Sequence, residues 1–493
     1  TGYSIYEIEV YGPAWSDETF VNEYLDQLSV PSRMTQDTLL PIADDDYGVN
    51  VSWESDSDAL TIDAQGNVSV VRGEQEQKVT LKAIVTRNEA VAEKVYEVTI
   101  PSNQPADYSI YPVPASMKEK DGTLIPDQEV TLVMEDEVDD YTKQHIYRVL
   151  EENGLSYAEA AEPDADGTNV ILGVADGKGA ADDYFARVDY DRSISTDKSE
   201  GYVLDVDEEK HAIAVMGHEN TGTSYGLDTL DQMLDQGEGE LKEVLIEDAP
   251  ETEFRGFIEG FYGEWTHENR MDLIRFCGEN KMNTYIYGPK SDPYHTAQWR
   301  DPYPAEQLAQ LAELVETGKQ HNVEVVWAAH VGGHIDLGSD EDIQALMDKF
   351  DQLYDIGVRQ FAVFFDDSST DNTHLVDFLN TIQHDYVDAK GDVKPLIMCP
   401  QYYNKNQGGV DYLRSLSQSD ERIQIMWTGD NVVSEVNQSM VDYITDLIGR
   451  PVYVWWNYPV NDLGRSHLLH MGPTEALQPG IENMSGLVSN PMN

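Results

Sequence analysis

The stretch FRGFIEGFYGEWTHENRMDLIRFCGENKMNTYIYGPKSDPYH, residues 254–295, decides the fold of the chain. It holds a strand-like run at 254–261 and a second one at 283–287, separated by an amphipathic helical run. Two strands joined in this way form a parallel β-α-β unit. We therefore expect the alternation to continue through residues 251–493.

Further strands and helices follow in the same order toward the C-terminus. The helical run from Ser339 to Ile356 places its apolar residues on one face and ends at Gly357, a typical helix stop. Eight strands over about 240 residues is the size of a (β/α)8 barrel. The eight predicted strands are 254–261, 283–287, 323–329, 360–365, 395–399, 423–427, 452–456 and 486–490.

Three segments precede this predicted barrel. Residues 104–250 mix strands with helical runs and predict a small α/β domain, so the fold class is α/β. Residues 12–103 show short alternating runs between turns, which is typical of an N-terminal Ig-like β-sandwich. Residues 1–11 are interpreted as the end of an upstream module, a possible carbohydrate-binding stub.

Composition excludes some partners. The formal net charge is −60, from 92 acidic and 32 basic residues, which repels nucleic acid and anionic membrane surfaces. No apolar run reaches about 18 residues, so no membrane span is expected. The two cysteines, Cys277 and Cys399, lie in a helical and a strand pattern, and we expect buried core thiols.

Polar groups and aromatics follow almost every predicted barrel strand, where the chemistry of such barrels lies. These residue types suit a sugar, because carboxylates and amides pair with hydroxyls and aromatic rings pack on its C–H faces. Asp366 and Asp367 follow an apolar strand, and burial is expected to raise the pKa of at least one, as a leaving-group acid requires. His330, His334 and Asp336 have a spacing that could hold a metal, but they lie in a glycine-containing loop and not in a clear helix, so no metal is expected. No cofactor is expected either.

The adjacency of the two carboxylates favours a particular mechanism. Acids that flank a glycosidic bond for retention stand about 5–5.5 Å apart, which neighbours on one strand achieve poorly. A substrate-assisted route fits better: the substrate's own 2-acetamido oxygen attacks the anomeric carbon, one acid orients the acetamido N–H, and the other protonates the leaving oxygen.

Several motifs resemble the barrel of glycoside hydrolase family 84, the O-GlcNAcase-like β-N-acetylglucosaminidases. The resemblance covers all of 251–493 and, more loosely, 106–250. Residues 104–250 also resemble the domain that precedes the barrel in several hexosaminidase families, and 12–103 resemble a bacterial Ig-like domain. The motifs are 254–295, FAVFFDDS (361–368), MWTG (426–429), VWWNYPVND (454–462) and SNPM (489–492).

The resemblance implies roles by position. Asp366 orients the acetamido group, and Asp367 is the general acid and then the general base. Tyr403 contacts the forming oxazoline, and Trp456 packs near the acetamido methyl. The substrate-binding residues implied are Gly260, Lys290, Tyr403, Thr428, Val432, Trp456, Asn457, Asp462 and Asn490.

Four departures from the family pattern affect the leaving-group side. The segment Gly263-Glu264-Trp265 is one residue shorter than is common, Phe365 replaces a usual Trp, and Gln401-Tyr402 replaces a usual Thr-Glu. The loop from Ala329 to His334 is also unusual for the family. They leave linkage preference open.

The resemblance implies a retaining exo-β-N-acetylglucosaminidase acting on terminal β-GlcNAc of glycans or glycoproteins, secreted or at the surface of a bacterium. One alternative keeps this chemistry but takes N-acetylgalactosamine or hyaluronan-like polymers. A family 20 hexosaminidase is disfavoured because that family carries Asp-Glu where this chain has Asp366-Asp367. A non-catalytic glycan-binding adhesin is the alternative of another class, and oligomeric state stays open.

Overall fold

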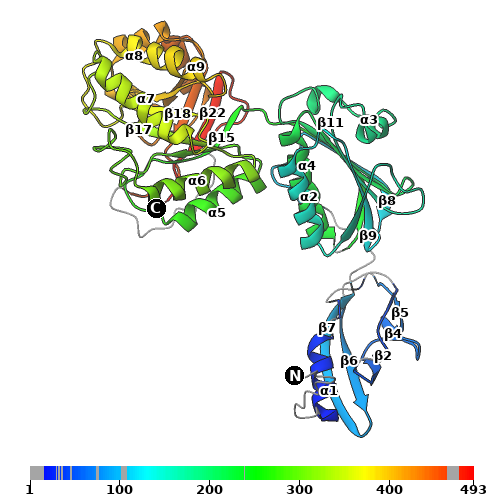
Figure 1. The fold of residues 1–493 in the computed structure, drawn as a ribbon. Coiled ribbons are helices and arrows are strands. Elements are labelled where there is room, and N and C mark those ends of the chain that lie inside the picture. The colour runs from blue at the N-terminus through cyan, green and yellow to red at the C-terminus, as the bar shows by residue number, and fades with distance from the viewer. Residues whose placement is uncertain are drawn as a thin grey trace, which may run out of the picture.

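The computed structural model describes residues 16–492 except 29, 32–33, 35–36, 45–46, 74–76, 101–107, 238 and 463–476. It consists of three bodies along the chain, which Figure 1 shows from blue to red. The predicted stub at 1–11 lies outside the described residues. No helix of the described part is long and apolar enough to cross a membrane.

The first body is the Ig-like domain, with an antiparallel four-stranded sheet (order β2-β3-β6-β7) and a three-stranded one (β1-β5-β4). A helix, which the sequence patterns did not predict, begins after Ser16 and packs Val21 and Leu25 against Val85 of the larger sheet. The elements are α1 (Asp17–Gln27), β1 (Thr38–Leu39), β2 (Ala43–Asp44), β3 (Val49–Ser55), β4 (Leu60–Ile62), β5 (Asn67–Val70), β6 (Gln77–Arg87) and β7 (Ala90–Ile100).

The second body is the α/β domain, a seven-stranded mixed sheet in the order β10-β9-β11-β13-β12-β14-β8. Helices α2 and α4 bury one face and α3 the other, so the central strands are apolar on both sides. The elements are β8 (Ser116–Leu124), β9 (Glu129–Met134), α2 (Asp140–Glu152), β10 (Ser156–Ala160), β11 (Asn169–Val174), α3 (Ala180–Phe185), η1 (Arg192–Ile194), β12 (Tyr202–Asp207), β13 (Ala212–Gly217), α4 (Asn220–Gly237) and β14 (Leu241–Asp248).

The third body is a closed barrel of eight parallel strands in sequence order, which confirms the predicted fold class. Its strands are β15 (Phe254–Glu259), β16 (Thr284–Tyr287), β17 (Glu324–His330), β18 (Phe361–Phe364), β19 (Ile397–Cys399), β20 (Gln424–Trp427), β21 (Val452–Trp456) and β22 (Met484–Ser489). Its helices are α5 (His267–Glu279), α6 (Ala305–Gln320), α7 (Asp340–Tyr354), α8 (Leu375–Thr381), η2 (Ile382–Val387), α9 (Asp388–Lys390), η3 (Lys405–Gln407), α10 (Val410–Ser415), η4 (Leu416–Gln418) and α11 (Gln438–Ile448).

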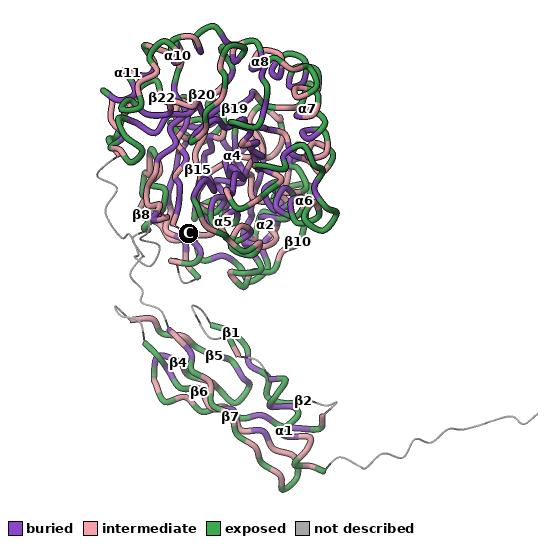
Figure 2. Tube along the Cα trace, turned by 90° about the vertical axis from the view of Figure 1, so that its left-hand side faces the viewer, coloured by how far each residue is buried: buried purple, intermediate pink, exposed green. Residues whose placement is uncertain are grey.

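Side chains alternate between two cores along each barrel strand, because the strand period is two. Residues such as Ile258, Phe364 and Tyr453 fill the barrel interior, whereas Val363 and Val454 pack outward against the helices. Figure 2 shows this buried material as the purple centre of the barrel. Cys277 and Cys399 are both buried and free, as predicted.

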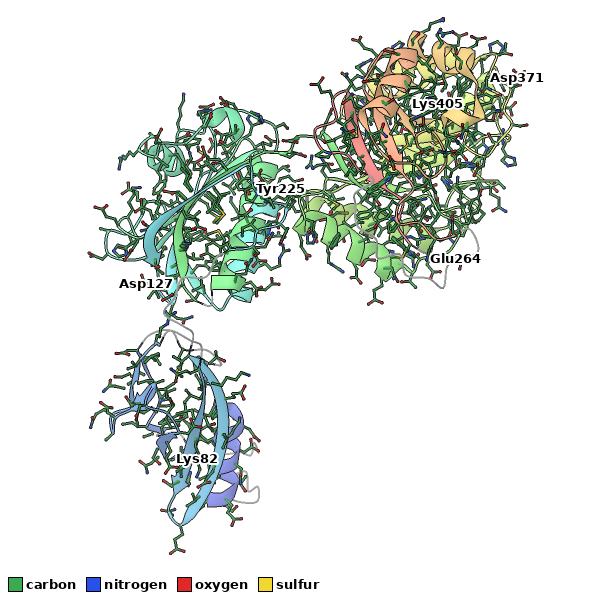
Figure 3. All side chains as sticks on the ribbon, turned by 180° about the vertical axis from the view of Figure 1, so that it is seen from behind. Lys82, Asp127, Tyr225, Glu264, Asp371 and Lys405 are labelled. Atoms are coloured by element: carbon green, nitrogen blue, oxygen red, sulfur yellow. The ribbon has the colours of Figure 1, made fainter. Side chains whose placement is uncertain are left out.

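The α/β domain covers the N-terminal end of the barrel. Arg255, at the start of β15, forms a 2.7 Å ion pair with Glu200 and donates to the Tyr225 hydroxyl, which Figure 3 labels on the side of the α/β domain that faces the barrel. Lys281, just before β16, donates to the hydroxyl of Tyr202 at 2.9 Å. These contacts leave the C-terminal ends of the strands uncovered by the α/β domain.

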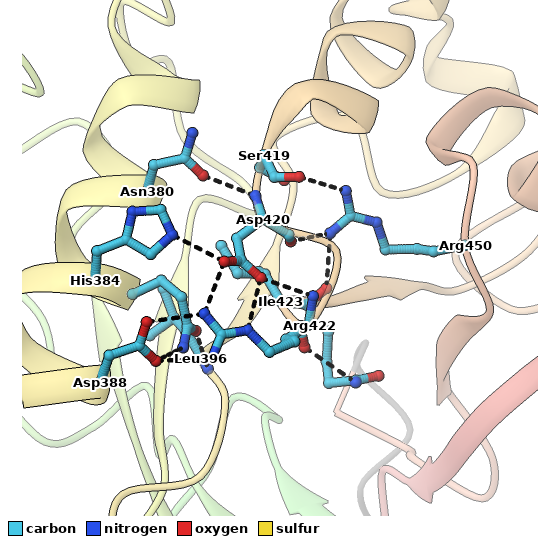
Figure 4. Close-up of polar contacts among 11 residues, drawn as sticks. Asn380, His384, Asp388, Leu396, Ser419, Asp420, Arg422, Ile423 and Arg450 are labelled. Atoms are coloured by element: carbon cyan, nitrogen blue, oxygen red, sulfur yellow. Dashed lines mark hydrogen bonds and ion pairs between the residues drawn. The ribbon is translucent and has the colours of Figure 1, made fainter. Parts of the chain in front are cut away.

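A polar network also connects residues that precede β20 and β21 at the N-terminal end of the barrel (Figure 4). Arg450, just before β21, donates to four backbone carbonyls in the turn before β20, those of Leu416, Ser419, Asp420 and Ile423. Burial lowers the pKa of Arg450 from its ordinary value. The network therefore stabilises the N-terminal end of the barrel and, among the described residues, makes no contact at the C-terminal ends of the strands.

Candidate active site

The pair Asp366–Asp367 stands at the C-terminal end of β18, where the strand gives way to a turn. Side chains of neighbouring strand residues point to opposite faces, so a regular strand would separate the two carboxylates. Asp367 instead adopts a left-handed backbone, with φ of 53°, which few non-glycine residues do. This departure from strand geometry places both carboxylates among polar groups of the same barrel end.

Asp366 is buried and lies beside a lysine and a histidine. Lys290 Nζ lies 2.7 Å from its Oδ2, and His330 Nε2 lies 3.4 Å from its Oδ1. Burial by itself raises the pKa of Asp366, but the Lys290 charge and the contacts with His330 outweigh burial and hold that pKa well below its ordinary value. The expectation that burial raises a pKa in this pair therefore fails at Asp366, which is ionised at neutral pH.

One oxygen of Asp366 lacks a hydrogen-bond donor among the described residues. Oδ1 is inaccessible to bulk solvent and accepts no hydrogen bond from the described part of the chain. A buried carboxylate oxygen without a donor is costly and attracts an N–H or O–H group. The site thus presents an ionised acceptor at a defined point.

Asp367 has a different environment, exposed and contacted by two phenols. Tyr403 donates to Oδ1 at 2.7 Å and Tyr262 donates to Oδ2 at 3.2 Å. Burial and the charge of Asp367 raise the pKa of Tyr262 to about 12 and move the pKa of Tyr403 higher still. Both phenols therefore remain protonated donors at neutral pH.

The backbone fixes Tyr403 in this position. Its N–H donates to Gln407 Oε1 at 2.8 Å, and its carbonyl accepts the N–H of Thr428 at 2.9 Å. The predicted pocket residue Thr428 is buried, and its hydroxyl donates to the carbonyl of Asn431 at 2.9 Å. Thr428 thus supports the wall of the site through the backbone.

Gly260 occupies a point of close approach at the end of β15. A β-carbon there would overlap the indole of Trp455, and its N–H donates to Asn490 Oδ1 at 3.3 Å. Asn490 in turn donates to Asn457 Oδ1 at 2.9 Å, which also accepts the Trp455 indole N–H at 3.0 Å. Three of the predicted residues are thereby joined in one hydrogen-bonded chain around Trp455.

The predicted place of Trp456 in the pocket is wrong. Trp456 belongs to the outward-facing core and stacks on Tyr458, with ring centroids 4.7 Å apart. Its neighbour Trp455 faces the barrel interior and packs against Phe364, with centroids 5.5 Å apart. Because adjacent strand residues alternate in direction, a prediction one residue out of register selected the wrong tryptophan.

The remaining predicted residues line the same end of the barrel. Asp462 Oδ2 accepts the N–H of Tyr262 at 2.8 Å, which links the loop after β21 to the loop after β15. Asn457 donates to the carbonyl of Val432 at 2.8 Å, and the Val432 side chain is exposed. All predicted site residues thus lie at the C-terminal end of the barrel, and among them Trp456 faces outward.

Three residues outside the predicted set complete the arrangement: Tyr262, His330 and Trp455. Tyr262 and His330 follow the first and third strands, so their place at strand ends was a usable signal. Trp455 required the register of β21, which the sequence pattern VYVWW does not specify. No cluster of three or more potential metal-binding side chains occurs in the described ranges.

Comparisons with known proteins divide the chain as the structure does. Residues 255–493 match the family described as beta-N-acetylglucosaminidase. Residues 107–249 match domain 2 of glycosyl hydrolase family 20, and residues 22–103 match the atrophied bacterial Ig domain. The match at 107–249 confirms that the α/β domain resembles a hexosaminidase domain.

Individual relatives point the same way. Protein O-GlcNAcase of Mus musculus is 29% identical over 253 residues, which are 48% of this chain but only 28% of the mouse protein. The solved structure of CpGH84D is 36% identical, with a TM-score of 0.72, and the match covers 78% of this chain and 66% of that one. For CpGH84B the identity is 33% and the TM-score 0.71, with 78% and 68% covered. The chain therefore belongs to glycoside hydrolase family 84, the O-GlcNAcase-like β-N-acetylglucosaminidases.

Proposed function

We propose that this chain is a retaining exo-β-N-acetylglucosaminidase that works by substrate-assisted catalysis. The observation that carries the proposal is the unequal environment of two adjacent carboxylates. Asp366 is buried, ionised and has one oxygen without a donor, whereas Asp367 is exposed and contacted by two phenols. A pair of acids held in different environments performs different tasks.

In the first step, the carboxylate of Asp366 accepts the N–H of the substrate's 2-acetamido group. This polarises the amide, and its carbonyl oxygen attacks the anomeric carbon. As the general acid, Asp367 transfers a proton to the glycosidic oxygen as the C–O bond breaks. The alcohol leaves, and the sugar remains as an oxazoline whose developing charge is balanced by Asp366.

In the second step, Asp367 acts as a base. It removes a proton from a water molecule, whose oxygen attacks the anomeric carbon and opens the oxazoline ring. The anomeric carbon is inverted twice, so the product keeps the β configuration. No protein side chain forms a covalent bond to the sugar, which fits a site whose two acids are neighbours in sequence.

The pocket residues support a terminal sugar as the substrate. The carboxylate of Asp462 and the carbonyl of Gly260 serve sugar hydroxyls, and Trp455 takes the apolar side of the acetamido group that Trp456 was predicted to take. The names of the relatives favour β-linked GlcNAc on glycans or glycoproteins. We further propose a secreted or cell-surface location in a bacterium, which the match to a bacterial Ig domain supports.

The test is release of p-nitrophenol from its β-N-acetylglucosaminide and β-N-acetylgalactosaminide. Wild type is compared with Asp367→Asn and with Asp371→Asn, an exposed acid of the same loop that accepts from Thr373. Fast glucosaminide release, lost only in Asp367→Asn, supports the proposal. Faster galactosaminide release overturns the substrate, and no release of either sugar with glycan binding retained favours the adhesin.

A further inference from the structure

We infer that His330 is a positioning residue for both carboxylates, because it holds the peptide group that joins Asp366 to Asp367. The inference rests on the function proposed above and adds a residue to it. His330 ends β17, and its ring is largely buried beside the carboxylate pair.

The geometry identifies the bond and the tautomer. Nε2 of His330 lies 2.8 Å from the backbone carbonyl oxygen of Asp366. A carbonyl only accepts, so Nε2 carries a hydrogen and donates. The same nitrogen lies 3.4 Å from Asp366 Oδ1, so one imidazole edge faces both the main chain and the side chain of this residue.

The carbonyl of Asp366 needs such a donor because the sheet no longer supplies one. Pairing between β17 and β18 ends at His330 and Phe364, two residues before Asp366. Past that point the chain turns, and Asp367 takes its left-handed conformation. A left-handed non-glycine residue persists where surrounding contacts hold it, and the His330 bond is such a contact.

His330 is itself held in place by a backbone hydrogen bond. Its backbone N–H donates to the carbonyl of His295 at 2.9 Å, and the two imidazole rings lie 6.0 Å apart. His295 is fully buried, and its ring bonds to the backbone carbonyl of Ala328 in β17. The anchor thus extends from the interior of the barrel to the peptide between the two acids.

The consequence is specific. Loss of the Nε2–H donor releases the 366–367 peptide, so the orientation of Asp366 and the direction of Asp367 change together. Displacement of catalytic groups by about 1 Å costs on the order of 100-fold in rate. We expect His330→Leu to lower kcat/KM by about 100-fold. Glutamine places an N–H near the position of Nε2, so we expect His330→Gln to recover most of this loss.

The experiment measures kcat and KM of wild type, His330→Leu and His330→Gln on the p-nitrophenyl β-N-acetylglucosaminide. His334→Leu serves as the matched control, since His334 is an exposed histidine of the same loop. Thermal unfolding of each variant checks the fold. A loss in Leu with recovery in Gln, and no change at His334, supports the inference.

A double-mutant cycle separates positioning from general disruption. It uses the 2,4-dinitrophenyl glycoside, whose leaving group needs little protonation, so the rate reports on Asp366. If His330 acts through Asp366, His330→Leu has a much smaller effect in the Asp366→Asn background than in wild type. Equal effects in both backgrounds, equal loss in Leu and Gln, or an unaffected Leu variant each overturn the inference. An inactive wild type overturns the proposed function instead.

Discussion

The indole ring of Trp455 lies so close to Gly260 that the space for a β-carbon at position 260 is already filled by it. Trp455 is in turn tied to Asn457, so the ring is not free to move aside. The two residues come from β21 and from the end of β15, strands separated in the barrel only by β22. Glycine at 260 is thus required by the indole of Trp455, as well as by any ligand that contacts its backbone.

A methyl group at this position tests the relationship. We expect Gly260→Ala to displace the indole and to lower kcat/KM on the glucosaminide by about 100-fold. The overpacking costs about 1–3 kcal/mol in the free energy of unfolding. Gly237→Ala is the control, because a β-carbon there meets other atoms only at 3.7 Å or more. A Gly260→Ala enzyme with wild-type kinetics would contradict the close packing.

Lys290→Met removes the cation that keeps Asp366 ionised. Burial then acts unopposed except by His330, so we expect the pKa of Asp366 to rise and the acidic limb of the pH–rate profile to move to higher pH. Removing one partner of a buried ion pair costs about 3–5 kcal/mol of stability.

The sign of the pH effect on stability follows from the same shift. Because the folded-state pKa of Asp366 is depressed, the ion pair stabilises wild type at all pH values above the ordinary pKa of 3.8 and loses that contribution as the pH falls through the depressed one. Urea unfolding between pH 3 and 8 is expected to show a stability difference from Lys290→Met that is largest in the neutral range. Lys405→Met, which alters a more exposed ion pair with Asp430, is the control; a matching shift in it would count against a specific effect at Asp366.

The two phenols on Asp367 are expected to contribute unequally. Tyr403 is buried and donates at 2.7 Å, whereas Tyr262 is 55% exposed and donates at 3.2 Å. We expect Tyr403→Phe to lower kcat by about 100-fold and Tyr262→Phe by about tenfold, because the shorter bond from the buried phenol is the stronger one. Steady-state kinetics on the glucosaminide measure both. The reverse ranking would show that the exposed phenol dominates.

The network of Arg450 shown in Figure 4 predicts an effect on stability alone. Arg450→Met leaves four backbone carbonyls without their charged donor, and we expect a loss of about 3 kcal/mol in the free energy of unfolding. The network lies at the opposite end of the barrel from Asp366, so kcat at 25 °C is expected to stay unchanged. Arg414→Met, at a solvent-exposed ion pair with Asp411, is expected to shift neither quantity.

The barrel was predictable because hydrophobic periodicity repeats eight times with helices between, and each strand end then follows from its strand. The assignment of Trp456 to the pocket failed by one residue of register. In VYVWW both candidate tryptophans are large and apolar, so hydrophobicity does not decide which faces inward; the pairing of β21 with β22 does. Helix α1 was missed because its apolar face is short, with Val21, Tyr24 and Leu25 buried only by the adjoining sheet.

The direction of the pKa shift of Asp366 could not be predicted from the sequence, because it depends on a contact between distant residues. The pattern shows that an acid follows a buried strand, and burial alone raises a carboxyl pKa. Whether Lys290 reaches it depends on the loop after β16, which is fixed when Asp292 accepts the hydroxyls of Tyr287 at 2.9 Å and Tyr303 at 2.6 Å. The resulting Lys290–Asp366 contact joins residues from separate β/α units, and no local pattern reveals it.

The left-handed backbone at Asp367 has a consequence for redesign of this enzyme class. Because one peptide bond joins Asp366 to Asp367, a change in the position of one carboxylate also moves the other. A single inserted or deleted residue there would displace both carboxylates. Under the proposed function, variants that accept a bulkier acyl group on the sugar nitrogen are therefore best sought at Trp455. The acid pair then stays unchanged, and the side chain at position 455 is the one to vary.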